Sequence, residues 1–149
     1  MPRLPFLDRG LTHSPIRYLD DVRLHDVPNA GGAYVLLAEP SNNFAYPRRR
    51  SSVFYIGQAL NLRGRLMTHA RYAWEAYFNR RRTLYWPMYE YAAAFGCRYA
   101  YLRTRGVQTP PQLEESLLAM FAERYRSWPV ANGAGGWGAL LSMRQLRTQ

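Results

Sequence analysis

The sequence contains no lysine, one cysteine and only ten acidic residues, and it has no long apolar run. Cys97 has no second cysteine in the chain, so an internal disulfide is excluded and a small, buried, apolar role is expected. No run approaches the ~18 apolar residues that a membrane-spanning helix needs. The opening residues 1–6 carry one charge and no apolar segment. A secretory signal is therefore not expected, and a cytoplasmic location is the prediction.

What the sequence does contain is enough apolar mass for one folded domain. Of the 149 residues, 48% are hydrophobic and 15% are aromatic, which excludes wholesale disorder. Two domains of ordinary size would be cramped in this length.

The charge of the chain is strongly positive, at +10, and every one of its basic residues is an arginine. A GC-rich genome also favours arginine over lysine, but the physical result is the same: guanidinium groups that can bind phosphates through two parallel hydrogen bonds. The expected partner is a polyanion, with DNA first and RNA as an alternative. A membrane surface ranks lower because no segment combines a basic face with a broad apolar face.

Residues 1–30 show little periodicity and predict an irregular arm with one short helix near residues 16–22. His13 and His25 in this arm have no second ligand at metal-binding spacing, so surface or capping roles are expected. Two apolar runs follow, Gly31–Ala38 and Ser52–Gly57, and both have the character of strands. They predict a β-hairpin whose long loop ends in a basic cluster.

Two helices and a third strand are predicted in the remainder. Apolar residues at helical spacing predict a helix over residues 61–79, with a buried stripe made of Leu62, Leu66, Ala73 and Tyr77. Residues 85–95 are expected to be helical, and residues 97–103 alternate as a strand. Thr109 followed by Pro110, with Gln112 three residues after the cap, predicts a helix that runs to about Arg126. Its expected buried stripe comprises Leu113, Leu117, Leu118 and Phe121.

These elements predict an α/β (α+β) fold with a small, mainly antiparallel, three-stranded sheet flanked by helices. The predicted organisation is an N-terminal arm over residues 1–30, one domain over residues 31–135 and a C-terminal tail over residues 136–149.

Five short motifs occur in order between Gly32 and Asn132. They are Gly32-Ala33-Tyr34, Tyr55-Ile56-Gly57, Arg65-x-x-x-His69, Glu114-x-x-Leu117-Leu118 and Pro129-x-x-Asn132. This ordered set resembles the GIY-YIG nuclease family. Ala33 replaces the usual isoleucine, and the 20 residues between Tyr34 and Tyr55 make the hairpin longer than usual, as in restriction-type members.

The resemblance implies a catalytic set made of Tyr34, Tyr55, Arg65, His69, Glu114 and Asn132. Tyr34 would act as general base or orient the water, Tyr55 would contact water or phosphate, and Arg65 would clamp the phosphate. His69 would hydrogen-bond phosphate, water or tyrosine, and Asn132 would support the site. Cross-strand packing is the structural alternative for the tyrosines, and a solvated helix face is the alternative for Arg65 and His69.

Glu114 is the metal ligand that the resemblance implies, with Mg²⁺ or Mn²⁺ as the cofactor. Glu115 is the rival ligand, and a solvated glutamate in the first turn of a helix is the structural alternative. The residues expected to contact the nucleic-acid backbone are Arg48, Arg49, Arg50, Arg63, Arg80, Arg81 and Arg82, although such clusters are also common in solvated loops.

The function that the resemblance implies is a Mg²⁺-dependent DNA endonuclease that leaves 5′-phosphate and 3′-hydroxyl ends, with restriction or defence as its role. The alternatives are a repair or single-strand-specific nuclease and a nucleic-acid-binding module without catalysis. The sequence leaves the oligomeric state open, a homodimer included.

Overall fold

The fold was analysed in a computed structural model, which describes residues 3–78 and 87–132. It is an α+β fold built on a four-stranded antiparallel sheet. The strands are β1 (Arg17–Tyr18), β2 (Gly32–Leu37), β5 (Val53–Ala59) and β6 (Arg98–Arg103), in the spatial order β1-β6-β2-β5. Strand β5 therefore forms one edge of the sheet.

The predicted hairpin is β2 paired with β5, in a register that places Tyr34 opposite Gly57. The long loop between them folds into a small hairpin of its own, made of β3 (Phe44–Ala45) and β4 (Arg50–Ser51). The predicted third strand is β6, which pairs with the other side of β2.

The prediction of three strands is corrected to four, because β1 adds to the outer edge of β6. The short helix expected near residues 16–22 is wrong: β1 lies there, and a 3₁₀ helix, η1 (Asp21–Asp26), follows it. A strand of two residues has no periodicity of its own, so only its pairing with β6 defines it.

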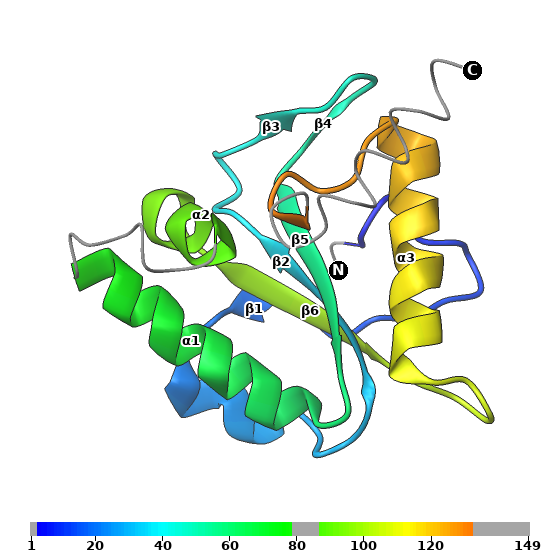
Figure 1. Ribbon diagram of the computed structural model, residues 1–149, viewed down its shortest axis with the longest axis horizontal. Helices are drawn as coiled ribbons and strands as arrows, with labels where there is room; N and C mark the ends of the chain where they lie inside the picture. Colours follow the sequence, from blue (N-terminus) through cyan, green and yellow to red (C-terminus); the bar gives the residue numbers. More distant parts are fainter. Residues whose placement is uncertain (1–2, 79–86, 133–149) are drawn as a thin grey trace.

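The helices lie on opposite faces of the sheet (Figure 1). Helices α1 (Leu62–Phe78) and α2 (Pro87–Phe95) cover one face together with η1, and α3 (Pro110–Tyr125) covers the other. The predicted capping box of α3 is present, since Thr109 Oγ1 accepts from Gln112 N and Gln112 Oε1 accepts from Thr109 N.

Alternate residues of β2 point to two separate cores, as expected for a central strand. Val35 packs on the α3 side with Leu117 and Phe121, and residues 4–7 of the predicted arm add Leu4, Phe6 and Leu7 to this core. Tyr34 packs on the α1 side with Leu62 and Leu66.

The buried stripe predicted for α1 is only partly correct. Leu62 and Leu66 are buried, whereas Tyr77 is 59% exposed. His69 and Ala76 are buried instead, so this helix turns a polar side chain into the core. In the described part of the chain, no helix has the length and apolar character to cross a membrane.

Candidate active site

Tyr34, His69 and Tyr89 form a hydrogen-bonded chain across the face covered by α1 and α2. The Tyr34 hydroxyl lies 2.6 Å from His69 Nε2, and His69 Nδ1 lies 2.9 Å from the Tyr89 hydroxyl. Strand β2, helix α1 and helix α2 each supply one of these side chains. Both ring nitrogens of a buried histidine are thereby satisfied.

Gly57 lets the Tyr34 ring cross the neighbouring strand. A Cβ atom at this position would collide with the hydroxyl and the ring of Tyr34. Gly32 has a comparable constraint, because a Cβ atom there would meet the Leu102 carbonyl oxygen and the Leu62 side chain. The glycines of the first two motifs therefore permit close approach between elements.

Tyr55 and Arg65 lie around the buried pair. The Tyr55 ring centroid is 6.1 Å from that of Tyr34 and 6.4 Å from that of His69. Arg65, four residues before His69 on α1, is exposed to solvent, and its charge influences the titration of Tyr34, Tyr55 and His69. The buried Tyr34–His69 pair thus lies near the exposed, positively charged side chain of Arg65.

Burial controls the protonation states of Tyr34 and His69. Desolvation raises the pKa of Tyr34 well above that of a free phenol, and the nearby charge of Arg65 only partly opposes this effect. Burial and the Arg65 charge together lower the pKa of His69 to about 4. At neutral pH the Tyr34 phenol and the His69 imidazole are therefore both uncharged.

Glu114 reaches the same region from the other face of the sheet. It lies in the second turn of α3, is half-buried, and its negative charge raises the pKa of Tyr55. Helices α1 and α3 lie on opposite faces of the sheet (Figure 1), and Arg65 on α1 and Glu114 on α3 both influence the titration of Tyr55 in the edge strand β5. Burial also raises the pKa of Glu114 itself.

The carboxylate of Glu114 is an oxygen ligand of the kind that Mg²⁺ takes. Among residues 3–78 and 87–132, Glu114 makes no hydrogen bond or ion pair, and no group of three or more His, Cys, Asp or Glu side chains is placed to share a metal. Mg²⁺ is commonly bound through one or two carboxylates, with water and substrate phosphates completing the shell. Glu115, the rival ligand, is exposed on α3.

Asn132 binds the main chain of the edge strand. Its Oδ1 accepts from Ile56 N at 2.9 Å and its Nδ2 donates to Ile56 O at 2.8 Å. This pair of bonds imitates a further strand at the residue next to Tyr55. Asn132 is thus in position to hold Tyr55 in place.

The predicted phosphate-binding arginines have different environments. Arg63 donates from Nε to Val27 O at 2.6 Å and from Nη2 to His25 O at 2.8 Å, which anchors α1 to the segment before β2. Arg48, Arg49 and Arg50 are exposed on the β3–β4 hairpin. The cluster Arg80, Arg81 and Arg82 lies outside the described residues.

Tyr89 is the member of the hydrogen-bonded chain that the sequence does not indicate. It is one of twelve tyrosines and lies in an aromatic segment without a clear helical stripe. Only the packing of α2 against α1 brings it to His69, so no sequence pattern identifies it.

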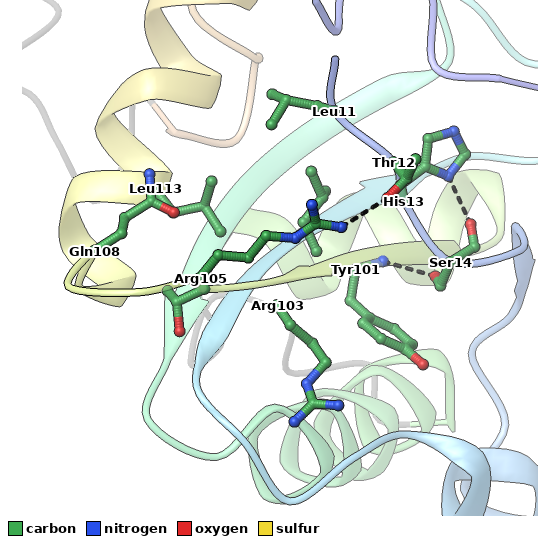
Figure 2. A pocket seen from close by; sticks show the side chains of 11 residues that line it. Leu11, Thr12, His13, Ser14, Tyr101, Arg103, Arg105, Gln108 and Leu113 are labelled. Atoms are coloured by element: carbon green, nitrogen blue, oxygen red, sulfur yellow. Dashed lines mark hydrogen bonds between the residues drawn. The ribbon is translucent and has the colours of Figure 1, made fainter. Parts of the chain in front are cut away.

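A cavity of about 680 Å³ has none of these site residues in its lining (Figure 2). It is enclosed by residues 11–14, the end of β6 and the loop before α3. His13 lines it, but Nε2 of this histidine accepts from Leu4 N and Nδ1 contacts Ser14 O. Both ring nitrogens of His13 therefore contact the main chain of the N-terminal segment.

Comparisons of the chain with models of known protein families, with curated proteins and with solved structures find no match.

Proposed function

We propose that the protein is a Mg²⁺-dependent endonuclease of the GIY-YIG type that hydrolyses phosphodiester bonds in DNA. The observation that carries the proposal is the hydrogen bond between Tyr34 and a neutral, buried His69, with Tyr55, Arg65 and Glu114 around it. Hydrolysis of a phosphodiester needs a base for water, positive charge at the phosphate and stabilisation of the leaving oxygen. These side chains supply the first two requirements directly.

In this proposal Tyr34 passes a proton from water to His69, which is neutral at neutral pH and so has a ring nitrogen that can accept it. The raised pKa of Tyr34 disfavours a resting phenolate, so its hydroxyl takes a proton from water as it gives its own to His69 Nε2. The water O–H bond and the original Tyr34 O–H bond break, and a new Tyr34 O–H bond and an Nε2–H bond form. This requires the tautomer in which His69 Nδ1 carries the hydrogen and donates it to Tyr89.

The exposed Arg65 is the group that would hold the phosphate over this pair. A guanidinium can bind two phosphate oxygens at once, and its charge offsets that of the attacked group. Glu114 would hold the magnesium ion, which supplies charge neutralisation and polarises the phosphate. Tyr55, between Tyr34 and Glu114, would orient the water or the phosphate.

The proposal also includes a biological role and a cellular location. The β3–β4 hairpin lengthens the β2–β5 connection and favours a restriction or defence enzyme over a repair enzyme. A cytoplasmic location remains the expectation from the sequence.

The test is an incubation of the purified chain with supercoiled plasmid, single-stranded DNA or RNA, each with Mg²⁺ or with chelator. Nicking or linearisation that requires Mg²⁺ is expected, and the nicked product should be sealed by a ligase without prior phosphorylation, as 5′-phosphate and 3′-hydroxyl ends demand. Binding without cleavage under all conditions would favour the non-catalytic binding module instead.

A further inference from the structure

A second cavity lies at the C-terminal end of α3, beside the β3–β4 hairpin and the N-terminal segment. Its volume is about 300 Å³, and its charged lining consists of Arg48, Arg49 and Arg124 together with Asp8 and Glu123. A main-chain hydrogen bond from Arg48 N to Tyr125 O, 3.4 Å long, ties the hairpin to this end of the helix. Arginines from two distant parts of the sequence, residues 48–49 and residue 124, thus line one cavity.

None of these arginines forms an ion pair with Asp8, with Glu123 or with any other carboxylate among the described residues. Nε of Arg124 is buried and has no hydrogen-bond partner, and the Arg124 Cζ atom lies 5.8 Å from the centre of the buried Tyr125 ring. A buried, unpaired donor on a charged group costs stability. The half-buried Arg124 side chain lines the cavity without an ion-pair partner among the described residues.

We infer that this cavity is a phosphate-binding subsite, filled by a backbone phosphate of a nucleic-acid strand. A phosphodiester offers several oxygen acceptors in different directions, so three guanidinium groups can share it, whereas a carboxylate offers only two oxygens. The two carboxylates of the lining oppose an anion, but the three arginines outnumber them. The volume lies at the small end of ligand sites and leaves room for a phosphate with its sugar.

The subsite lies on the same helix as Glu114, which relates it to the candidate active site. Arg124 follows Glu114 by ten residues, which is about 15 Å along a helix that rises by about 1.5 Å per residue. Duplex DNA rises by about 3.4 Å per base pair, so this separation corresponds to about four base pairs. A duplex that runs parallel to α3 would place this cavity about four base pairs from a cut beside Glu114. This inference rests on the nucleic-acid binding of the proposed function, not on its hydrolytic chemistry.

Salt-dependent binding tests the subsite without cleavage. A fluorescent DNA duplex and a single strand of equal length are titrated by anisotropy in chelator at several salt concentrations. The proteins compared are the full chain, Arg124→Gln, Arg49→Gln and Arg126→Gln. Arg49 is exposed, so its replacement leaves the cores intact if Arg124→Gln fails to fold. Arg126 is the matched control, since it is exposed at the same end of α3 and does not line the cavity.

Each cavity variant should make the log–log slope of affinity against salt shallower by about 0.9 on duplex DNA, or about 0.7 on a single strand, for each phosphate contact that is lost. The Arg126→Gln slope should stay closer to that of the unmodified chain. Slopes of both cavity variants that equal the Arg126→Gln slope would overturn the subsite.

Cleavage measured separately in Mg²⁺ distinguishes the two proposals. If the unmodified protein cuts DNA but both cavity variants keep its salt slope, only the proposed subsite is contradicted. If the salt slopes change as expected but the protein does not cut DNA, the subsite is supported and the hydrolytic function is contradicted. If the protein binds neither the duplex nor the single strand, the subsite and the proposed function are both contradicted.

Discussion

At the scale of single residues, Tyr34 has two roles to separate, packing in the core and proton transfer, and both depend on one hydroxyl. Tyr34→Phe removes that hydroxyl and keeps the ring in place. Loss of the hydrogen bond to His69 should cost about 1 kcal/mol of stability. Loss of the proton transfer should reduce the single-turnover cleavage rate by ~10²–10⁴, with DNA affinity unchanged. Cleavage within a few-fold of the unmodified rate would make Tyr34 a packing residue.

Tyr89 acts on the reaction only through His69, so we regard it as a positioning residue. Tyr89→Phe removes the acceptor for His69 Nδ1–H and frees the imidazole to adopt the other tautomer, which cannot accept from Tyr34. The loss of one such bond should slow cleavage by roughly tenfold and change its pH profile. Tyr72→Phe is the matched control, because its ring packs on Tyr89 at 5.5 Å and it makes no hydrogen bond to His69. Equal rates in the two variants would argue against this role.

The buried imidazole also predicts how stability depends on pH. The pKa of His69 is about 4 in the folded protein against 6.5 for the free side chain, so the unfolded chain binds the proton first as the pH falls. The contribution of the neutral His69 to the free energy of unfolding is fully present above pH 6.5 and is lost as the pH falls to about 4. Its size is on the order of 3 kcal/mol.

Urea unfolding of the unmodified chain and of His69→Gln measures this contribution. The difference in unfolding free energy between the two should change across this pH window. The raised pKa of Glu114 acts in the opposite direction, but it is common to both proteins and cancels in the difference. A difference that does not vary with pH would mean that His69 is not held neutral by the fold.

At the scale of elements, the free edge of β5 is held by a side chain. Asn132→Ala leaves Ile56 N–H and C=O without partners beside Tyr55, which should lower the unfolding free energy by about 1–3 kcal/mol. Hydrogen exchange at the Ile56 amide should accelerate, because that amide loses its acceptor. Asn132→Asp is the matched variant: it keeps an oxygen for Ile56 N–H and loses only the Nδ2 donor. Equal protection of Ile56 in all three proteins would exclude the support role.

The elements also show what the sequence can and cannot predict. Helix α3 and its Thr109 cap could be predicted from local signals, and so could the pairing of β2 with β5, because their causes lie within a few residues. Strand β1 could not, since its pairing with β6 depends on residues far along the chain.

The same distinction applies to the site. The motifs name Tyr34 and His69, and the structure joins them, whereas their contact with Tyr89 and the anchoring role of Arg63 arise only from tertiary packing.

At the scale of the whole molecule, the charge of +10 and the position of the candidate site beside the β5 edge both bear on the proposed function. Helices α1 and α3 lie on opposite faces of the sheet (Figure 1). Arg65 on α1 and Glu114 on α3 both influence the titration of Tyr55 in β5. A strongly positive molecule attracts DNA to its surface before any specific contact forms. Specific chemistry then depends on whether Glu114 provides the metal site.

The most direct test of the central claim is the cleavage of supercoiled plasmid in Mg²⁺ by the unmodified chain, Glu114→Gln and Glu115→Gln. Glu115 is the neighbouring, exposed carboxylate, so its variant controls for the loss of one negative charge on α3. Glu114→Gln should abolish cutting while DNA binding in chelator stays intact or tightens, and Glu115→Gln should cut at the normal rate. Full cleavage by Glu114→Gln would contradict the proposed metal site.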